Sequence, residues 1–163
     1  VVKLCRSTFE APDGTRFDRD VVRHPGAVSV VPLLDDGTLV MVRQYRAAID
    51  SLVLEIPAGK RDVPGEAPEV TAARELVEEV GLSAGRLEHL AVFHNSIGFS
   101  DEESHVYLGT RLEPAEMDRQ GIEEQHMEIV HVPLSDAAAM IAAGEITDAK
   151  TVIGLTLTLA RQG

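Results

Sequence analysis

Hydrophobic and polar positions divide the chain into short apolar segments separated by turn residues. The segment 1–24 is mostly polar around an Asp13-Gly14 pair, which predicts two short strands joined by a tight turn. Residues 26–34 form an apolar run, an Asp36-Gly37 pair follows, and apolar residues then alternate with others as far as Tyr45. This pattern predicts a second, buried hairpin.

Further along the chain, strand patterns are mixed with helical ones. Strands are predicted over 51–57, 87–94, 104–110 and 127–132, and helices over 67–80, 135–143 and 148–161. Pro68 suits the first turn of its helix and Gly81 suits the end, while Ser135 is expected to cap the next helix. The stretches 95–103 and 113–126 are predicted to be loops, and loops of that length in a compact domain are often functional.

The helix predicted at 67–80 has one apolar face and one acidic face. At 3.6 residues per turn, five apolar residues gather on a stripe that should face the core: Val70, Ala73, Leu76, Val77 and Val80. The opposite face carries three carboxylates flanked by an arginine: Glu75, Glu78, Glu79 and Arg74.

Three neighbouring carboxylates are unfavourable on an isolated helix. Like charges at these spacings cost roughly a few tenths of a kcal/mol per pair, and carboxylates in the last turns also oppose the helix dipole. A solvated acidic face is the ordinary interpretation. A bound divalent cation would reverse the sign of the interaction, and oxygen ligands converging from one helix face suit Mg²⁺ or Mn²⁺. We therefore expect a metal site here.

Length and charge narrow the classes of protein that remain. A chain of 163 residues fits one domain. Its longest apolar run, 27–34, is far shorter than the ~20 residues that span a bilayer, so no membrane segment is expected. Fifteen Lys and Arg against 27 Asp and Glu give a net charge of −12, which leaves no basic face for nucleic acid. The lone Cys5 excludes a disulfide within the chain and favours a cytoplasmic location.

The segment 57–82 contains a glycine, a spaced glutamate, and then Arg-Glu-apolar-x-Glu-Glu-x-Gly-apolar. This pattern resembles the signature of the Nudix hydrolase family, with its positions filled by Gly59, Glu66, Arg74, Glu75, Leu76, Glu78, Glu79, Gly81 and Leu82. Six residues separate Gly59 from Glu66 where the common pattern has five, so the path of that loop is left open.

The resemblance implies a fold and an organisation. The expected fold is an α/β Nudix α/β/α sandwich, with a mixed β-sheet between the acidic helix and the C-terminal helices. Residues 25–163 would form the Nudix hydrolase domain, and residues 1–24 would form a short N-terminal β arm. Relatives form homodimers through such strands, so the arm is expected to serve dimerisation.

Three further segments, "VRQYR", "LEIPAG" and "GFSDE", look like the ADP-ribose pyrophosphatase branch of the family. That likeness implies Mg²⁺-dependent hydrolysis of ADP-ribose or a related nucleoside diphosphate sugar to AMP and ribose 5-phosphate, with Mn²⁺ as the alternative ion and two or three ions per site. Two other functions stay open. One is a pyrophosphatase for GDP-mannose or another nucleotide sugar, and the other is a non-catalytic sensor that binds ADP-ribose.

The resemblance also implies roles for individual residues. The metal ligands would be Glu75, Glu79 and the backbone carbonyl of Ala58, with Glu78 close to a second or third ion, while Arg74 would orient the glutamates. The general base is expected from a loop in the C-terminal third, where "GIEEQHMEI" places Glu124 as first choice and Glu123 as second. The alternative is that this loop is simply acidic and solvated.

Substrate contacts are expected from two other parts of the chain. Arg46 would grip the diphosphate as a charge-assisted donor, with Glu55 in support, although a surface arginine and an ordinary ion pair are the alternatives. The loop "HNSIGFSDEE" would line the terminal ribose pocket through Gly98, Ser100 and Glu102. Among the aromatic residues, one of the arm could stack on the base in the partner subunit's site, with Phe9 and Phe17 as candidates.

Overall fold

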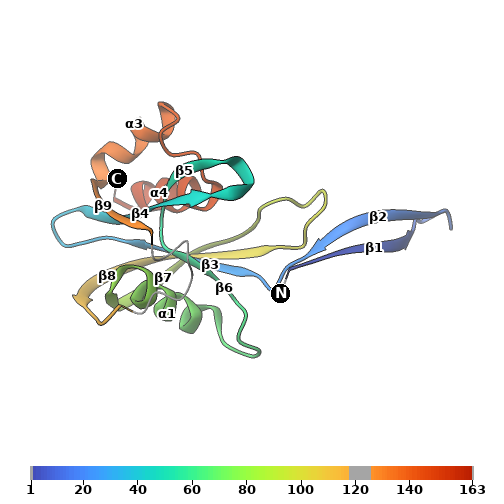
Figure 1. Ribbon diagram of the computed structural model, residues 1–163, viewed down its shortest axis with the longest axis horizontal. Helices are drawn as coiled ribbons and strands as arrows, with labels where there is room; N and C mark the ends of the chain where they lie inside the picture. The colour runs from blue at the N-terminus through green and yellow to red at the C-terminus, as the bar shows by residue number, and fades with distance from the viewer. Residues whose placement is uncertain (1, 118–125, 163) are drawn as a thin grey trace.

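The computed structural model describes residues 2–117 and 126–162. A body of sheets and helices carries one long two-stranded arm that projects from it (Figure 1). The elements are, in order, β1 Lys3–Glu10, β2 Arg16–Arg23, β3 Ala27–Pro32, β4 Thr38–Arg46, η1 Ala47–Ile49, β5 Ser51–Glu55, β6 Ala58–Lys60, α1 Pro68–Val80, β7 Leu82–His94, β8 Glu103–Pro114, β9 Glu128–Pro133, η2 Leu134–Asp136, α3 Ala137–Ala142 and α4 Ala149–Gln162.

Two sheets build the body. The first has four strands in the order β6-β3-β8-β7, with β3 and β8 parallel and the other pairs antiparallel. The second has three antiparallel strands in the order β5-β4-β9. The expected α/β fold with a mixed sheet is confirmed, because parallel and antiparallel pairs share the first sheet.

Side chains of β3 alternate between two cores. Val28 and Val30 belong to the cluster that contains Leu76 of α1. Val31 belongs to the other cluster, which contains Leu155 of α4. Since successive strand residues point to opposite faces, α1 and α4 cover opposite faces of the first sheet, as Figure 1 shows. This is the sandwich expected from the resemblance.

The hairpin predicted over 26–46 is wrong beyond its turn. Gly37 donates its N–H to the Leu34 carbonyl at 3.0 Å, and Leu33 bridges Leu39, but β3 and β4 then diverge into separate sheets. The reason is that both edges of each strand are occupied: β3 pairs with β6 and β8, and β4 pairs with β5 and β9. The Asp36-Gly37 pair predicts a turn, but it does not indicate whether the two strands beside the turn go on pairing with each other.

Other boundaries also differ from the prediction. The single strand expected at 51–57 is two strands, β5 and β6, separated at Ile56 and Pro57, since proline has no N–H for a ladder. Strand β7 begins at Leu82, which is earlier than predicted. The Ser135 cap is wrong: its hydroxyl donates to the Asp136 carboxylate at 3.1 Å, and the helix begins at Ala137 with no side-chain cap.

The helix expected at 67–80 is present as α1. Pro68 is its first residue, and Gly81 ends it with φ of 67° and an N–H bonded to the Val77 carbonyl at 2.9 Å. Its buried face differs from the predicted stripe, because Val70 is 55% exposed whereas Glu79 is only 4% exposed. No helix among the described residues is long and apolar enough to cross a membrane.

Candidate active site

Strand β6 crosses the acidic face of α1 and explains the buried glutamate. The Ala58 N–H donates to Glu79 Oε2 at 2.9 Å, so this carboxylate is covered by a strand that also satisfies it. A Cβ built on Gly59 would lie 1.9 Å from the Glu75 carboxylate carbon. A side chain at residue 59 would force this carboxylate to move, which gives a physical reason for the glycine of the sequence pattern.

Arg74 lies among the carboxylates of the motif. Its Nη1 is 2.8 Å from Glu78 and 3.0 Å from Glu75, and its Nη2 is 3.4 Å from Glu66. Burial alone would lower the pKa of Arg74, but the charges of Glu75, Glu78 and Glu66 together outweigh it and raise the pKa. The arginine therefore stays charged and orients three glutamates.

Glu66 is placed by the loop that precedes α1. It accepts hydrogen bonds from the Thr71 hydroxyl at 2.7 Å and from Arg74 at 3.4 Å. The extra residue between Gly59 and Glu66 lies within an exposed stretch that ends in a turn, where the Glu66 N–H bonds to the Val63 carbonyl at 3.2 Å. Gly65 has φ of 80° in that turn, a conformation that favours glycine.

A divalent cation suits the donors on this wall, although they do not form a ready-made cage. Within residues 2–117 and 126–162, no three His, Cys, Asp or Glu side chains are grouped as a metal site. The available donors are nevertheless hard oxygens: the carboxylates of Glu75, Glu78 and Glu79 on one helix and the carbonyl of Ala58 on the adjacent strand.

These groups line a cleft of about 860 Å³, a volume in the range of small-molecule sites. Glu75, Glu78 and Glu79 are on one side, and Arg46, Glu55 and Lys150 are also among the lining residues. Glu102 and His24 lie at the cleft as well. The structure thus brings together the acidic helix, Arg46, which was predicted to bind the diphosphate, and Glu102 of the loop predicted to line the terminal ribose pocket.

Arg46 lies in the cleft but is also engaged by protein. Its Nε and Nη2 donate to the two carboxylate oxygens of Glu55, each at 2.7 Å. The side chain of Glu55 is 1% exposed, while that of Arg46 is 43% exposed. The hydrogen bonds to Glu55 raise the pKa of Arg46 although burial opposes this, so the arginine is held as a fixed positive charge at the cleft.

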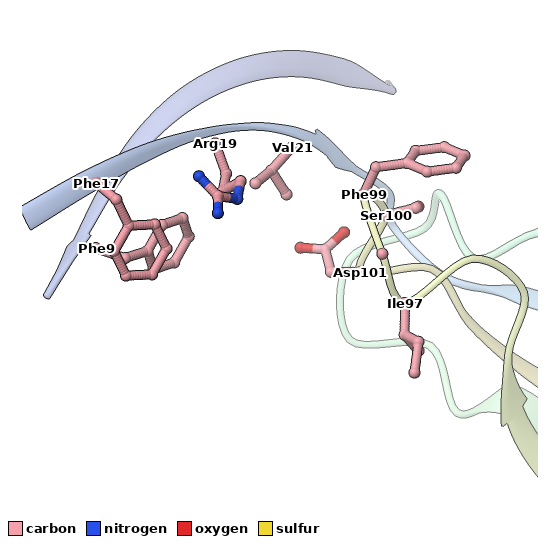
Figure 2. A pocket seen from close by; sticks show the side chains of 9 residues that line it. Phe9, Phe17, Arg19, Val21, Ile97, Phe99, Ser100 and Asp101 are labelled. Atoms are coloured by element: carbon pink, nitrogen blue, oxygen red, sulfur yellow. The ribbon is translucent and has the colours of Figure 1, made fainter. Parts of the chain in front are cut away.

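Gly98 and Ser100 lie in a different pocket from Glu102. This second pocket, of about 320 Å³, is bounded by the arm and by the loop 97–101. Figure 2 shows the stacked rings of Phe9 and Phe17 on the arm, across from the loop that carries Ser100. Ser100 Oγ accepts the Glu102 N–H at 3.2 Å, which connects the two pockets along one loop.

Asp101 fixes this loop to the base of the arm. Its carboxylate accepts hydrogen bonds from the Arg23 side chain at 3.0 Å and from the His24 N–H at 2.8 Å. These bonds hold the pKa of Asp101 below its ordinary value of 3.8. The Val22 N–H also bonds to the Phe99 carbonyl at 2.7 Å. The position of the predicted sugar loop therefore depends on strand β2.

Two expected residues lie outside the described residues, and several cleft residues were missed, Lys150 among them. Glu123 and Glu124 fall within 118–125, so their role stays a prediction. Lys150 was missed because it contacts Glu55 from 95 residues away along the chain, and no local pattern marks it. The nearest sequence hint is Asp148, which accepts the Thr151 N–H at 3.0 Å as a helix cap does.

The structure thus places an acidic helix against a mixed sheet, with a fixed arginine lining the same cleft. The NUDIX domain model matches residues 23–152. The chain belongs to the Nudix family and is a Nudix hydrolase.

Known proteins agree with this assignment. The chain is 40% identical over 155 residues to an ADP-ribose pyrophosphatase of Bacillus subtilis (strain 168), covering 95% of this chain and 83% of that protein. It is 39% identical over 155 residues to an ADP-ribose pyrophosphatase of Mycobacterium tuberculosis (strain ATCC 25618 / H37Rv), covering 95% and 75%. A solved structure of an ADP compounds hydrolase has a TM-score of 0.85 and 25% identity, covering 100% of this chain and 94% of that one.

Proposed function

We propose that this protein hydrolyses the diphosphate bond of ADP-ribose to AMP and ribose 5-phosphate, with Mg²⁺ as the working ion. The observation that carries the proposal is that the carboxylates of α1 and the guanidinium of Arg46 line one cleft. Similarity to the ADP-ribose pyrophosphatases of B. subtilis and M. tuberculosis supports the substrate.

The chemistry accounts for these residue types. One water is consumed, a bond between phosphorus and the bridging oxygen breaks, and the two products each leave with a phosphate monoester. Attack on a diphosphate is opposed by its own negative charge, and divalent cations neutralise that charge and activate water. In a protein of net charge −12, local cations at the site are all the more necessary.

On this proposal, Glu75, Glu79 and the Ala58 carbonyl hold the ions, and Glu78 lies near a second or third ion. Arg74 orients Glu75 and Glu78, as its contacts at 3.0 and 2.8 Å support. Glu124 serves as the general base, with Glu123 as the second choice. Both precede β9, which pairs with β4, the strand that ends at Arg46.

Substrate binding is assigned to the remaining cleft residues. Arg46, supported by Glu55, binds the diphosphate, and Glu102 contributes to the terminal ribose pocket. Gly98 and Ser100 shape the loop that carries Glu102, as the bond from the Glu102 N–H to Ser100 Oγ supports.

We also propose a homodimer and a cytoplasmic location. Residues 1–24 would be the dimerisation arm and residues 25–163 the Nudix domain. The support is that β1 and β2 pair with each other along their whole length, whereas, among the described residues, the hydrogen bonds between the arm and the loop 97–101 come from the base of the arm, at Val22, Arg23 and His24. Leu4 of the arm is 76% exposed, and Phe9 is 40% exposed. The lone Cys5 supports a reducing compartment.

A substrate panel tests the proposed function. Purified protein with Mg²⁺ is incubated with ADP-ribose, GDP-mannose and other nucleotide sugars, and the products are identified by chromatography and mass spectrometry. We expect AMP and ribose 5-phosphate from ADP-ribose at the highest kcat/KM. A higher kcat/KM for GDP-mannose would show that the substrate is GDP-mannose and not ADP-ribose. Tight binding of ADP-ribose without any turnover would show that the protein is a non-catalytic sensor.

A further inference from the structure

Glu55 is a buried carboxylate held by two cations. Arg46 binds both of its oxygens at 2.7 Å, and Lys150 Nζ of α4 makes a short contact with Oε2. Lys150 also lies 3.0 Å from Asp148 Oδ2. We call Arg46, Glu55, Asp148 and Lys150 the charged quartet. Two positive and two negative groups make it neutral, which offsets the cost of burying Glu55.

Hydrogen bonds through Thr151, which is not part of the charged quartet, fix the segments that carry Asp148, Lys150 and Glu55. Asp148 accepts both the N–H and the hydroxyl of Thr151, at 3.0 and 2.6 Å. The Thr151 oxygen in turn accepts the N–H of Ile56 at 3.0 Å. Because Ile56 follows Glu55 directly, the first turn of α4 is joined to the end of β5. Lys150 is therefore held at a set position relative to Glu55.

The charge pattern indicates what Lys150 does. Asp148 and Glu79 both lie close enough to Arg46 for their charges to raise its pKa. Without Lys150, Glu55 and Asp148 would repel each other and compete for the same guanidinium. With Lys150 between them, Arg46 is left to pair with Glu55 alone. Its side chain is 43% exposed and lines the cleft, and its Nη1 has no hydrogen bond to any described residue.

We propose that Lys150 is a positioning residue for the diphosphate of the substrate. It acts through Glu55, which it holds so that Arg46 presents one edge of its guanidinium to the substrate. The inference rests on the proposed function, in which Arg46 binds the diphosphate. It adds a residue of α4 to a site otherwise built from β4, β5, β6 and α1.

Lys150→Met tests the role, since methionine keeps most of the stem and removes the charge. Binding of α,β-methylene-ADP, a diphosphate ester that resists hydrolysis at its bridge, is measured by calorimetry with Mg²⁺ present. We expect the affinity to fall about tenfold and the KM for ADP-ribose to rise by the same factor, with kcat changed less than about twofold, because uniform binding is lost. Lys150→Arg keeps the charge and should recover binding to within about threefold.

Glu55→Gln separates positioning from direct contact. If Lys150 acts through Glu55, adding Lys150→Met to Glu55→Gln causes no further loss of affinity for the analogue. Three results would overturn the proposal. The first is a further tenfold loss of affinity when Lys150→Met is added to Glu55→Gln, and the second is wild-type affinity in Lys150→Met alone. The third is a Lys150→Met variant in which only kcat falls. Thermal unfolding identifies variants that do not fold; should Lys150→Met be among them, the double variant and Lys150→Arg decide.

The two proposals fail in different ways. Absence of ADP-ribose hydrolysis by the wild-type protein would overturn the proposed function. The analogue measures the diphosphate contact without turnover, so its binding by the wild-type protein and the variants still decides the role of Lys150.

Discussion

The carboxylate of Glu75 occupies the space that a side chain of residue 59 would take. A side chain of even one carbon at Gly59 would lie 1.9 Å from the Glu75 carboxylate carbon and 2.2 Å from both of its oxygens. Because Gly59 has no side chain, the carboxylate of Glu75, a proposed metal ligand, has room beside β6. The same strand supplies the Ala58 N–H that fixes Glu79.

Gly59→Ala should therefore displace either β6 or Glu75. We expect a loss of about 1–3 kcal/mol in the free energy of unfolding, as for other overpacked sites, together with weaker Mg²⁺ binding. Urea unfolding and calorimetry measure the two effects. Adding Glu75→Ala removes the obstructing carboxylate and should recover stability but not activity. Wild-type stability and activity for Gly59→Ala would contradict the packing argument.

Glu79→Gln keeps the shape of the side chain and removes the charge needed by a metal ligand. We expect kcat to fall at least about 100-fold at saturating Mg²⁺, roughly 2.7 kcal/mol of transition-state stabilisation, with the fold preserved. Steady-state kinetics and circular dichroism measure these quantities. Glu69→Gln, on the exposed first turn of the same helix, is the matched control and should retain activity. Near wild-type kcat for Glu79→Gln would remove Glu79 from the ligand set.

Glu124→Gln tests the general base. General base catalysis contributes about 10² to 10⁴ in rate, so kcat should fall by that order while affinity for α,β-methylene-ADP changes little. Glu123→Gln is the matched comparison on the adjacent residue and should retain most of the activity. A large loss at Glu123 with a small one at Glu124 would move the base by one position.

Asp101 should make the loop 97–101 sensitive to acid. Its folded-state pKa is lowered below 3.8, so its stabilising contribution is present above that value and is lost as the pH falls through the folded-state pKa. Asp101→Asn should loosen the loop at neutral pH, seen as faster hydrogen exchange at the Val22 N–H, which bonds to Phe99. Unchanged exchange at Val22 in this variant would show that Asp101 does not hold the loop.

The proposed dimer predicts that the arm's aromatic pair matters for association. Phe9 and Phe17 stack with ring centroids 5.9 Å apart and remain 40% and 37% exposed. Replacing both with Ala should weaken self-association by at least about tenfold, measured by analytical ultracentrifugation. Val63→Ala, 48% exposed in the loop before α1, is the control. A wild-type protein that sediments as a monomer at all concentrations would contradict the dimer.

The helix and the turns could be predicted from sequence because their causes are local. Pro68 and Gly81 mark the ends of α1 through backbone constraints that act within a few residues. The turn at Gly37 formed as predicted for the same reason. The divergence of β3 and β4 could not be predicted, since it depends on which distant strands pair with each one.

The acidic face illustrates the same limit within one element. Periodicity placed Val70 on the core-facing stripe and Glu79 on the opposite face, but β6 covers Glu79 and Val70 is exposed. Helical spacing defines which residues share a face. It does not define which neighbouring strand covers that face, nor that a backbone N–H will satisfy a buried carboxylate.

The sequence by itself determined the family, the acidic helix and the glycine beside it, because a motif within 57–82 depends on contacts close along the chain. Only the tertiary structure decided that Lys150 would meet Glu55 and Arg46, or that Gly98 and Ser100 would line the pocket at the arm and not the main cleft. These contacts join segments that are far apart along the chain. Their geometry follows from strand pairing and helix packing, which local patterns of residues do not specify.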